Sequence, residues 1–152
     1  MFGKYGIEHT YVEMDDLDAV TAAIKPNTKM FFVETPTNPM MNVTDIAAMA
    51  EIARRHDLLL IVDNTFLSPY FQNALDLGAD IVVHSGTKYL GGHNDTLAGF
   101  LVTNREVISE KFRFLIKTVG SGLAPFDSWL ILRGIKTLGI RMERSQENAK
   151  QI

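Results

Sequence analysis

The sequence predicts an α/β fold in which helices flank a mainly parallel sheet. Short apolar runs of strand length alternate along the chain with segments whose apolar residues recur at helical spacing. Three of these runs, residues 30–33, 58–62 and 79–83, are apolar almost throughout, which is typical of parallel strands covered on both faces. Because such strands are joined by right-handed crossovers, their carboxyl ends are expected to meet at one edge of the sheet.

The first half of the chain is expected to contain two strands and two helices. Residues 9–14 alternate polar and apolar side chains, which predicts a strand before the one at 30–33. Asp16 can cap a helix that contains Leu17, Val20 and Ile24, and Pro26 is expected to end it. Asp45 opens a second helix, whose last turn carries two arginines where positive charge suits the helix dipole.

The second half continues this alternation and is expected to end in one long helix. Trp129, Leu132, Ile135, Leu138 and Met142 keep helical spacing, and proline is tolerated at a helix start, so residues 125–151 are predicted to form one continuous helix. The elements expected before it are a strand at 58–62, a short helix at 71–77, strands at 79–83 and 96–102, and a helix at 106–118.

Composition favours a single globular domain that does not bind nucleic acid or cross a membrane. The 152 residues are 46% hydrophobic and 22% charged, which suits one core and argues against disorder. No apolar run approaches the roughly 20 residues of a spanning helix, and a net charge of −3 gives no basic stripe. Without cysteine there is no disulfide or thiolate metal site, and without a secretory apolar core at the N-terminus a cytoplasmic location is expected.

Polar residues follow three of the predicted strands at the point where each strand ends. Asn38 follows the first apolar run, Asp63 follows the second, and Ser85, Thr87 and Lys88 follow the third. In sheets of this kind ligands bind outside the carboxyl ends of the strands. The sequence therefore predicts a binding site built from these five residues.

The residue types at this predicted site suit pyridoxal phosphate (PLP). The hydroxyls of Ser85 and Thr87 and nearby backbone N–H groups can bind a phosphate, and the amine of Lys88 can form an imine with an aldehyde. Asp63 can keep a pyridine nitrogen protonated, which the cofactor needs to act as an electron sink, and Asn38 is placed to contact the ring hydroxyl. Taken alone, Ser85–Lys88 also fits a plain turn with an exposed lysine.

The residues of this region also suggest other functions, most of which the sequence disfavours. A phosphohydrolase could use Asp63 as nucleophile, but such enzymes want a second aspartate two residues on, where this chain has Thr65. A metal site at His84, His93 and Asp95 is disfavoured because nothing predicts that these side chains converge. A scaffold domain without catalysis is the remaining alternative.

Four segments resemble the Cys/Met-metabolism (trans-sulfuration) family of PLP-dependent enzymes, which includes cystathionine lyases and methionine γ-lyase. They are residues 34–39, 62–66, 85–93 and 132–138. The resemblance implies the large domain of the fold-type I, aspartate-aminotransferase-like architecture. It also implies that Asn38–Pro39 is a cis peptide.

By this resemblance each residue of the predicted site acquires a role. Lys88 is the catalytic lysine that forms the Schiff base, and Asp63 is the partner of the ring nitrogen. Ser85 and Thr87 are phosphate ligands, and Asn38 contacts the ring hydroxyl. The site is expected to need no metal.

The resemblance further implies a carbon–sulfur lyase or transferase. Its substrates would be sulfur amino acids such as cystathionine, methionine, cysteine or O-acylhomoserine, and its reactions β- or γ-elimination or γ-replacement. Residues 121–127 favour a lyase. Family members are much longer and usually tetrameric homo-oligomers, so residues 1–152 are expected to be part of the PLP-binding large domain, without its N-terminal segment and the small domain. We expect this chain by itself to be inactive or to bind cofactor weakly.

Overall fold

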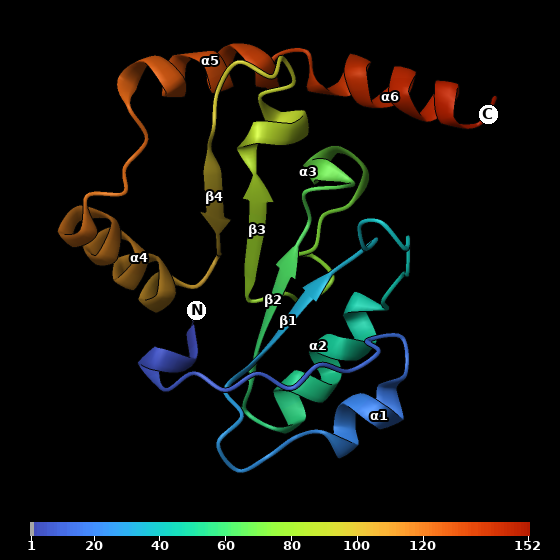
Figure 1. Cartoon of the computed structure of the whole chain (residues 1–152), viewed down its shortest axis with the longest axis vertical. Coiled ribbons are helices and arrows are strands. Elements are labelled where there is room, and N and C mark those ends of the chain that lie inside the picture. Colours follow the sequence, from blue (N-terminus) through green and yellow to red (C-terminus); the bar gives the residue numbers. More distant parts are fainter. Residues whose placement is uncertain (1) are drawn as a thin grey trace.

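The computed structural model describes residues 2–152 and contains a four-stranded sheet in the order β1-β2-β3-β4 (Figure 1). β1 (Met30–Glu34), β2 (Leu59–Asp63) and β3 (Ile81–Ser85) are parallel, whereas β4 (Gly99–Val102) runs antiparallel to β3. The predicted α/β fold with a mainly parallel sheet is therefore confirmed. The predicted strand at 96–102 is shorter than expected and is the antiparallel one.

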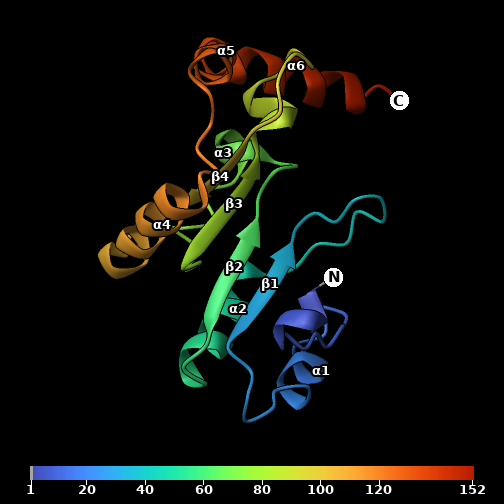
Figure 2. The same cartoon turned by 60° about the vertical axis from the view of Figure 1, so that its left-hand side comes forward.

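Helices lie beside the sheet and across the end where the parallel strands finish (Figures 1 and 2). α1 and α2 lie at the β1–β2 side, α4 lies beside β4, and α5 and α6 cross the end above β3, where both contact the short η2. The helical segments are η1 (Phe2–Tyr5), α1 (Leu17–Ala22), α2 (Ile46–Arg55), α3 (Ser68–Phe71), η2 (Gly86–Leu90), α4 (Glu106–Val119), α5 (Pro125–Ile135) and α6 (Leu138–Ala149).

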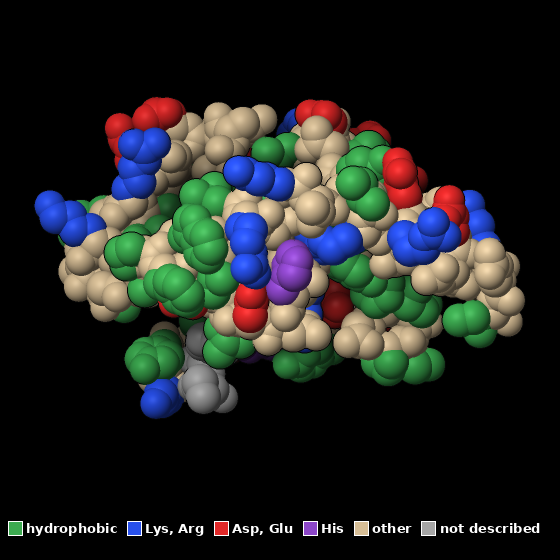
Figure 3. All heavy atoms as spheres, turned by 90° about the horizontal axis from the view of Figure 1, so that it is seen from above, with side chains coloured by type: hydrophobic (Ala, Val, Ile, Leu, Met, Phe, Trp, Pro, Cys, Tyr) green, Lys and Arg blue, Asp and Glu red, His purple; other side chains and the backbone are tan. Residues whose placement is uncertain are grey.

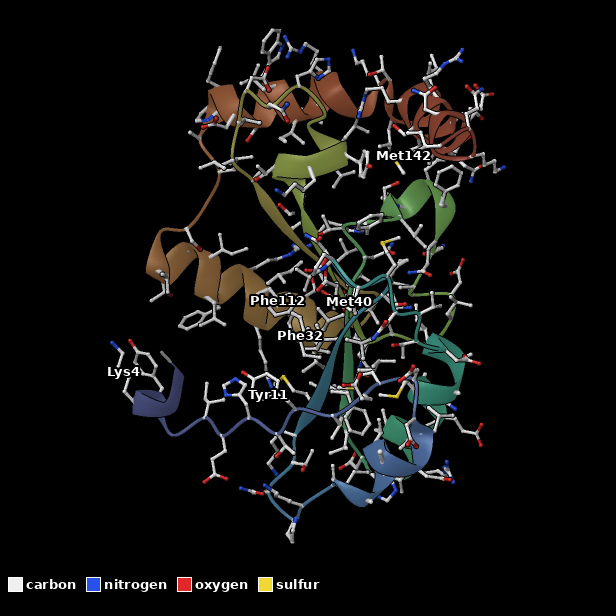
Figure 4. The ribbon with its side chains drawn as sticks, turned by 45° about the vertical axis from the view of Figure 1, so that its right-hand side comes forward. Lys4, Tyr11, Phe32, Met40, Phe112 and Met142 are labelled. Atoms are coloured by element: carbon white, nitrogen blue, oxygen red, sulfur yellow. The ribbon has the colours of Figure 1, made fainter. Side chains whose placement is uncertain are left out.

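Two apolar clusters hold these layers together. The larger lies between α2 and one face of the sheet, where Met49, Leu60 and Val62 are fully buried. The smaller joins α6 to η2 through Leu138, Met142 and Leu90, and Figure 4 labels Met142 on α6. The second cluster therefore ties the C-terminal helices to the segment that contains Lys88.

Both predicted helix caps in the first half of the chain are confirmed. The Asp16 carboxylate accepts from the Ala19 backbone N–H at 2.9 Å at the start of α1, and Asp45 accepts from Ala48 at 3.0 Å at the start of α2. Each carboxylate satisfies a backbone donor that has no partner within its helix. The caps explain why both helices begin where the sequence indicated.

Two local predictions were wrong. Residues 9–14 form no strand, because this segment pairs with no strand in the described part of the chain. The short helix lies at Ser68–Phe71 and not at 71–77. Gln72 is extended, with φ −142° and ψ 120°, because the Asn64 side-chain amide donates to its carbonyl at 2.7 Å and draws the chain out of the helix.

The predicted long helix at 125–151 was also wrong, since it is interrupted between Ile135 and Leu138. The break lies at the Gly134 carbonyl, which accepts from the Thr137 backbone N–H and hydroxyl, both at 3.2 Å, and from Arg141 Nη2 at 2.8 Å. These donors replace the bond that a regular α-helix would make four residues on. The break is therefore produced by side chains of the next turn.

The expectation that the strand at 30–33 is covered on both faces was wrong for this chain. Val33 is buried against α2, but the alternate residues Met30 and Phe32 are 48% and 56% exposed. Figure 4 labels Phe32 on β1. An uninterrupted apolar run thus leaves one side of β1 open to solvent here.

No helix within residues 2–152 is both long enough and apolar enough to cross a membrane.

Candidate functional site

The three parallel strands end on the same side of the sheet, and η2 directly follows the end of β3 (Figures 1 and 2). Glu34 is in register with Asp63, and Asp63 is in register with Val83, two residues before Ser85. Side chains along a strand alternate between faces, so Glu34, Asp63 and Ser85 lie on the same face. The structure therefore brings together two of the predicted site residues, Asp63 and Ser85, and adds Glu34.

Asp63 is half-buried at the end of β2 and accepts a hydrogen bond from the Thr65 backbone N–H at 3.0 Å. Within residues 2–152 neither Asp63 nor Glu34 forms an ion pair. A half-buried carboxylate without a cationic partner is suited to a protonated ring nitrogen, since a charge-assisted hydrogen bond would stabilise both groups. The Asp63 carboxylate therefore fits the pyridine end of PLP as a hydrogen-bond acceptor.

Thr65 joins the ends of β2 and β3. Its hydroxyl oxygen accepts from the Ser85 backbone N–H at 2.8 Å, while its own N–H is the donor to Asp63. One residue thereby fixes the loop beyond Asp63 against the backbone of Ser85. The sequence pattern around Thr65, which lies in one of the segments that resemble the family, does not predict this bridging contact.

Lys88 stands on a tightly bonded turn directly after β3. The Gly91 N–H donates to the Gly86 carbonyl at 2.8 Å, and the Gly92 N–H donates to the Lys88 carbonyl at 2.7 Å. Lys88 itself has φ −91° and ψ −123°, which are not helical, and its side chain is exposed. Its amine forms no ion pair with any described residue.

Gly86 lets this turn lie close to β4. A Cβ atom there would fall 2.5 Å from a ring carbon of Phe100 and 2.9 Å from the Ala98 side chain.

Figure 3 views the molecule from the α5–α6 end and shows Lys and Arg side chains spread among hydrophobic ones.

The hydroxyls of Ser85 and Thr87 differ in their contacts. Thr87 Oγ1 accepts from the Ala98 N–H at 3.1 Å and donates to the Ala98 carbonyl at 3.4 Å. The Ser85 hydroxyl has no hydrogen bond to another described residue. A phosphate could therefore accept a hydrogen bond from the Ser85 hydroxyl without breaking an existing one. At Thr87 the phosphate would have to replace the bond from the hydroxyl to the Ala98 carbonyl, which at 3.4 Å is long for a hydrogen bond.

Asn38 lies in the exposed loop after β1. Its backbone N–H donates to the Glu34 carboxylate at 3.3 Å. The peptide bond between Asn38 and Pro39 is cis, as the sequence predicted, and a second cis bond precedes Pro36. The loop that contains Asn38 is thus hydrogen-bonded to Glu34 at the end of β1, and Glu34 is in register with Asp63.

A buried amide network joins the loops that leave β1 and β2. Asn64, which is 1% exposed, accepts from Gln72 Nε2 at 2.8 Å and donates to the Gln72 carbonyl at 2.7 Å. Gln72 Nε2 also donates to the Thr35 carbonyl at 3.3 Å. The loops that follow Glu34 and Asp63 are therefore held at a fixed separation.

His84 lies on the opposite face of β3 from Ser85 and is 6% exposed. It lines a cavity of about 250 Å³ together with Val82, Leu90 and Phe100, and its Nδ1 has no hydrogen-bond partner among the described residues. Burial lowers the pKa of His84, while the charge of Asp63 and a backbone hydrogen bond oppose that shift. This hollow is thus separate from the face that carries the predicted cofactor ligands.

The residues weighed as a metal site do not converge. His93 Nδ1 bonds the Gly91 carbonyl at 2.7 Å, and Asp95 forms an ion pair with Arg133 at 2.6 Å. In the described part of the chain, no three His, Asp or Glu side chains are grouped so that they could hold a metal ion.

The sequence of the whole chain matches one protein family. That family, described as Cys/Met metabolism PLP-dependent enzyme, matches residues 1–152. The chain belongs to this family. The resemblance found in the sequence is confirmed, and membership in a PLP-dependent family speaks against the phosphohydrolase alternative.

Two curated relatives within the Cys/Met metabolism family illustrate the similarity. Cystathionine gamma-lyase of Bacillus subtilis is 51% identical over 152 residues, which is 100% of this chain and 40% of that protein. Cystathionine gamma-synthase of Haemophilus influenzae is 49% identical over 146 residues, 96% of this chain and 40% of that protein. The chain thus spans about 40% of the length of these relatives.

Solved structures from the same family share the fold. Cystathionine gamma-lyase from Lactobacillus plantarum complexed with L-serine matches with a TM-score of 0.90 and 52% identity, over 91% of this chain and 36% of that one. The metB protein of Corynebacterium glutamicum matches with a TM-score of 0.97 and 46% identity, over 99% and 39%. The α/β architecture is therefore that of known family members.

Several contacts around the strand ends and the turn after Lys88 were not predicted from the sequence. Glu34, Thr65 and Gln72 hold the loops around Asp63, and Arg141 holds the turn after Lys88. No local sequence pattern indicates that the Gln72 side chain bonds to the loop after β1. For the turn after Lys88, a glycine at 134 inside an otherwise helical pattern was the available sign of close backbone approach.

Proposed function

We propose that this chain provides the PLP-binding face of a carbon–sulfur lyase or transferase that acts on sulfur amino acids. The substrates would be cystathionine, methionine, cysteine or O-acylhomoserine, and the reactions β- or γ-elimination or γ-replacement. The observation that carries the proposal is the placement of Asp63 and Ser85 on one face, beside the turn of Lys88, in a chain of this family.

Each predicted residue would serve one part of the cofactor. When bound, PLP would withdraw electron density from the substrate's α-carbon. The Lys88 amine would hold the aldehyde and then move the proton at that carbon, and Asp63 would hold the ring nitrogen proton. Ser85 and Thr87 would bind the phosphate, and Asn38 would contact the ring hydroxyl.

The relatives support both a lyase and a transferase. A lyase at 51% identity and a synthase at 49% are nearly equally similar to this chain, so overall identity favours neither reaction. The proposal therefore names a class of substrates and leaves the choice of reaction open; both relatives are named for cystathionine.

We also propose that, in the working enzyme, further polypeptide covers the exposed apolar side chains of β1 and α4. This polypeptide would come from the same molecule or from another copy in a homo-oligomer. Phe32 on β1 and Phe114 and Val119 on α4 are 56%, 67% and 73% exposed. Large exposed apolar patches usually mark contact surfaces. Residues 1–152 would then be part of a larger PLP-binding domain, and the chain alone would be inactive or bind cofactor weakly.

The test is to locate where PLP attaches. The chain is incubated with PLP, reduced with borohydride and digested, and the pyridoxyl mass is mapped by mass spectrometry. Label is expected on Lys88 before any other lysine. Asp63→Asn and Ser85→Ala should each weaken PLP binding about tenfold or more, because each removes a hydrogen bond to a charged group.

The control is Lys136→Arg, which removes an exposed lysine at the α5–α6 break and should leave PLP binding unchanged. Equal labelling of all lysines, or unchanged binding by Lys88→Arg, would contradict the proposal. Release of phosphate from an aryl phosphate in the presence of magnesium would instead support the hydrolase.

A further inference from the structure

Arg141 is the side chain through which α6 holds the turn that follows Lys88. Its Nη1 donates to the Tyr89 carbonyl at 2.7 Å, its Nη2 to the Gly134 carbonyl at 2.8 Å, and its Nε to the Thr137 hydroxyl at 3.1 Å. None of these acceptors is charged, and no carboxylate in residues 2–152 pairs with Arg141. This guanidinium is therefore used to hold neutral groups, two of them backbone carbonyls.

Two glycines allow this close approach. A Cβ atom at Gly92 would fall 2.1 Å from Nη1 of Arg141 and 2.3 Å from its Cζ. A Cβ atom at Gly134 would fall 2.1 Å from the Gly91 carbonyl oxygen. The guanidinium and α5 thus lie directly against the backbone of the turn, and the resulting burial lowers the pKa of Arg141.

The turn has its own internal bonds and is also held from outside at two residues: Thr87, whose N–H donates to the Ala98 carbonyl at 3.3 Å, and Tyr89. Internally, the N–H groups of Gly91 and Gly92 bond back to Gly86 and Lys88. Externally, the carbonyl of Tyr89, the residue next to Lys88, is bound by Arg141. Since the Lys88 backbone is not helical, helix geometry alone does not fix its direction.

We propose that Arg141 is a positioning residue for Lys88. By binding the Tyr89 carbonyl it would fix the direction in which the Lys88 amine leaves the turn, and it would tie that direction to the α5–α6 break. The proposal rests on the proposed function, in which the Lys88 amine reacts with an aldehyde. Its local part, that Arg141 orders the turn, stands apart from the cofactor.

A purely structural role makes a different prediction. Arg141 could simply attach α6 to the rest of the fold, and its loss would then lower stability everywhere alike. Arg141→Lys separates the two roles, because lysine keeps the charge but cannot donate in three fixed directions. Arg144 offers a matched control, since it lies on the same helix and, among the described residues, forms an ion pair only with Glu147 at the surface.

The first measurement is amide hydrogen exchange by NMR. In Arg141→Lys the Gly91 and Gly92 amides should exchange about tenfold faster, as expected for loss of a hydrogen bond to a charged group. The Leu60 amide, in the central β2, should not change, nor should any of the three in Arg144→Lys. Equal acceleration at Leu60 would show a global effect and overturn the inference, as would unchanged exchange at the two glycines.

The second measurement is the rate of borohydride trapping of PLP on Lys88. Arg141→Lys should slow trapping about tenfold, and Arg141→Ala should recover when guanidinium ion, but not ammonium, is added at a non-denaturing concentration. The inference would be overturned if Arg141→Lys trapped PLP at the wild-type rate. It would also be overturned if Arg141→Ala trapped PLP slowly and guanidinium ion did not restore the rate. If Arg141→Ala does not fold, the lysine variant decides.

The two failures are distinguishable. If the wild-type chain is never labelled on Lys88, the proposed function fails, and with it the role of Arg141 toward a reactive amine. The exchange data would then still decide whether Arg141 orders the turn.

Discussion

Gly134→Ala tests whether α5 really lies against the backbone of the turn after Lys88. A Cβ atom at this position would fall 2.1 Å from the Gly91 carbonyl oxygen and 2.8 Å from the Leu90 carbonyl oxygen. Both are backbone atoms, so neither can rotate away as the end of a flexible side chain would. The helix and the turn would have to move apart by roughly 1.5 Å to restore ordinary contact distances.

The free energy of unfolding shows which of two effects is larger. Alanine is favoured over glycine inside a helix by about 1 kcal/mol, so propensity alone predicts a stabilised variant. Overpacking of a fixed contact costs about 1–3 kcal/mol, and the value here should lie at or above the top of that range because backbone meets backbone. Subtracting the gain of about 1 kcal/mol in helix propensity from an overpacking cost of about 3 kcal/mol or more, we expect Gly134→Ala to lose about 2 kcal/mol or more.

The assay is equilibrium unfolding in urea, followed by circular dichroism and by the fluorescence of Trp129, the single tryptophan, which lies on α5. Gly122→Ala is the matched control, since its nearest heavy atom would be 3.9 Å from the new Cβ and its stability should change by no more than about 0.5 kcal/mol. A midpoint for Gly134→Ala equal to or above that of the wild type would refute the close contact.

Three further predictions concern groups away from this contact. Burial lowers the pKa of His84 below its usual 6.5, so the folded state binds fewer protons than the unfolded chain, and stability should be full above pH 6.5 and fall as the pH drops below it. Urea midpoints measured against pH should show a smaller fall in His84→Asn. Asn64→Leu should cost about 1–3 kcal/mol by the same assay, because the Ser68 carbonyl and the part-buried Gln72 carbonyl each lose a hydrogen bond from the Asn64 amide. Asp80→Ala should cost more than Arg105→Ala, since Asp80 also accepts from the buried Leu60 N–H at 2.8 Å whereas their ion pair is partly exposed; equal costs would contradict this.

Local sequence patterns predicted the elements that depend on local causes. The caps at Asp16 and Asp45 and the apolar runs of β1, β2 and β3 lie where they were expected. Elements that depend on side-chain contacts seven or eight residues along the chain were missed. The break after α5 depends on Arg141, and the end of α3 depends on Asn64, and neither contact leaves a periodic signal in the sequence.

The site followed the same division. Asp63 and Ser85 were predicted to meet because parallel strands end at a common edge, and register places them on one face. The side chains that hold this arrangement were not predicted. Tyr89 and Arg141, for example, are 52 residues apart and meet only because α6 folds back over η2.

The order of the sheet has a consequence for handling the chain in solution. β1 and β4 each have a neighbour on one side only, so in the described residues both margins of the sheet present backbone N–H and C=O groups that are free to pair with another strand. On β4 the margin is flanked by Leu101 and Val102, which are 50% and 41% exposed. Concentrated samples should therefore form strand-paired assemblies, and a lysine in place of Leu101 should suppress them.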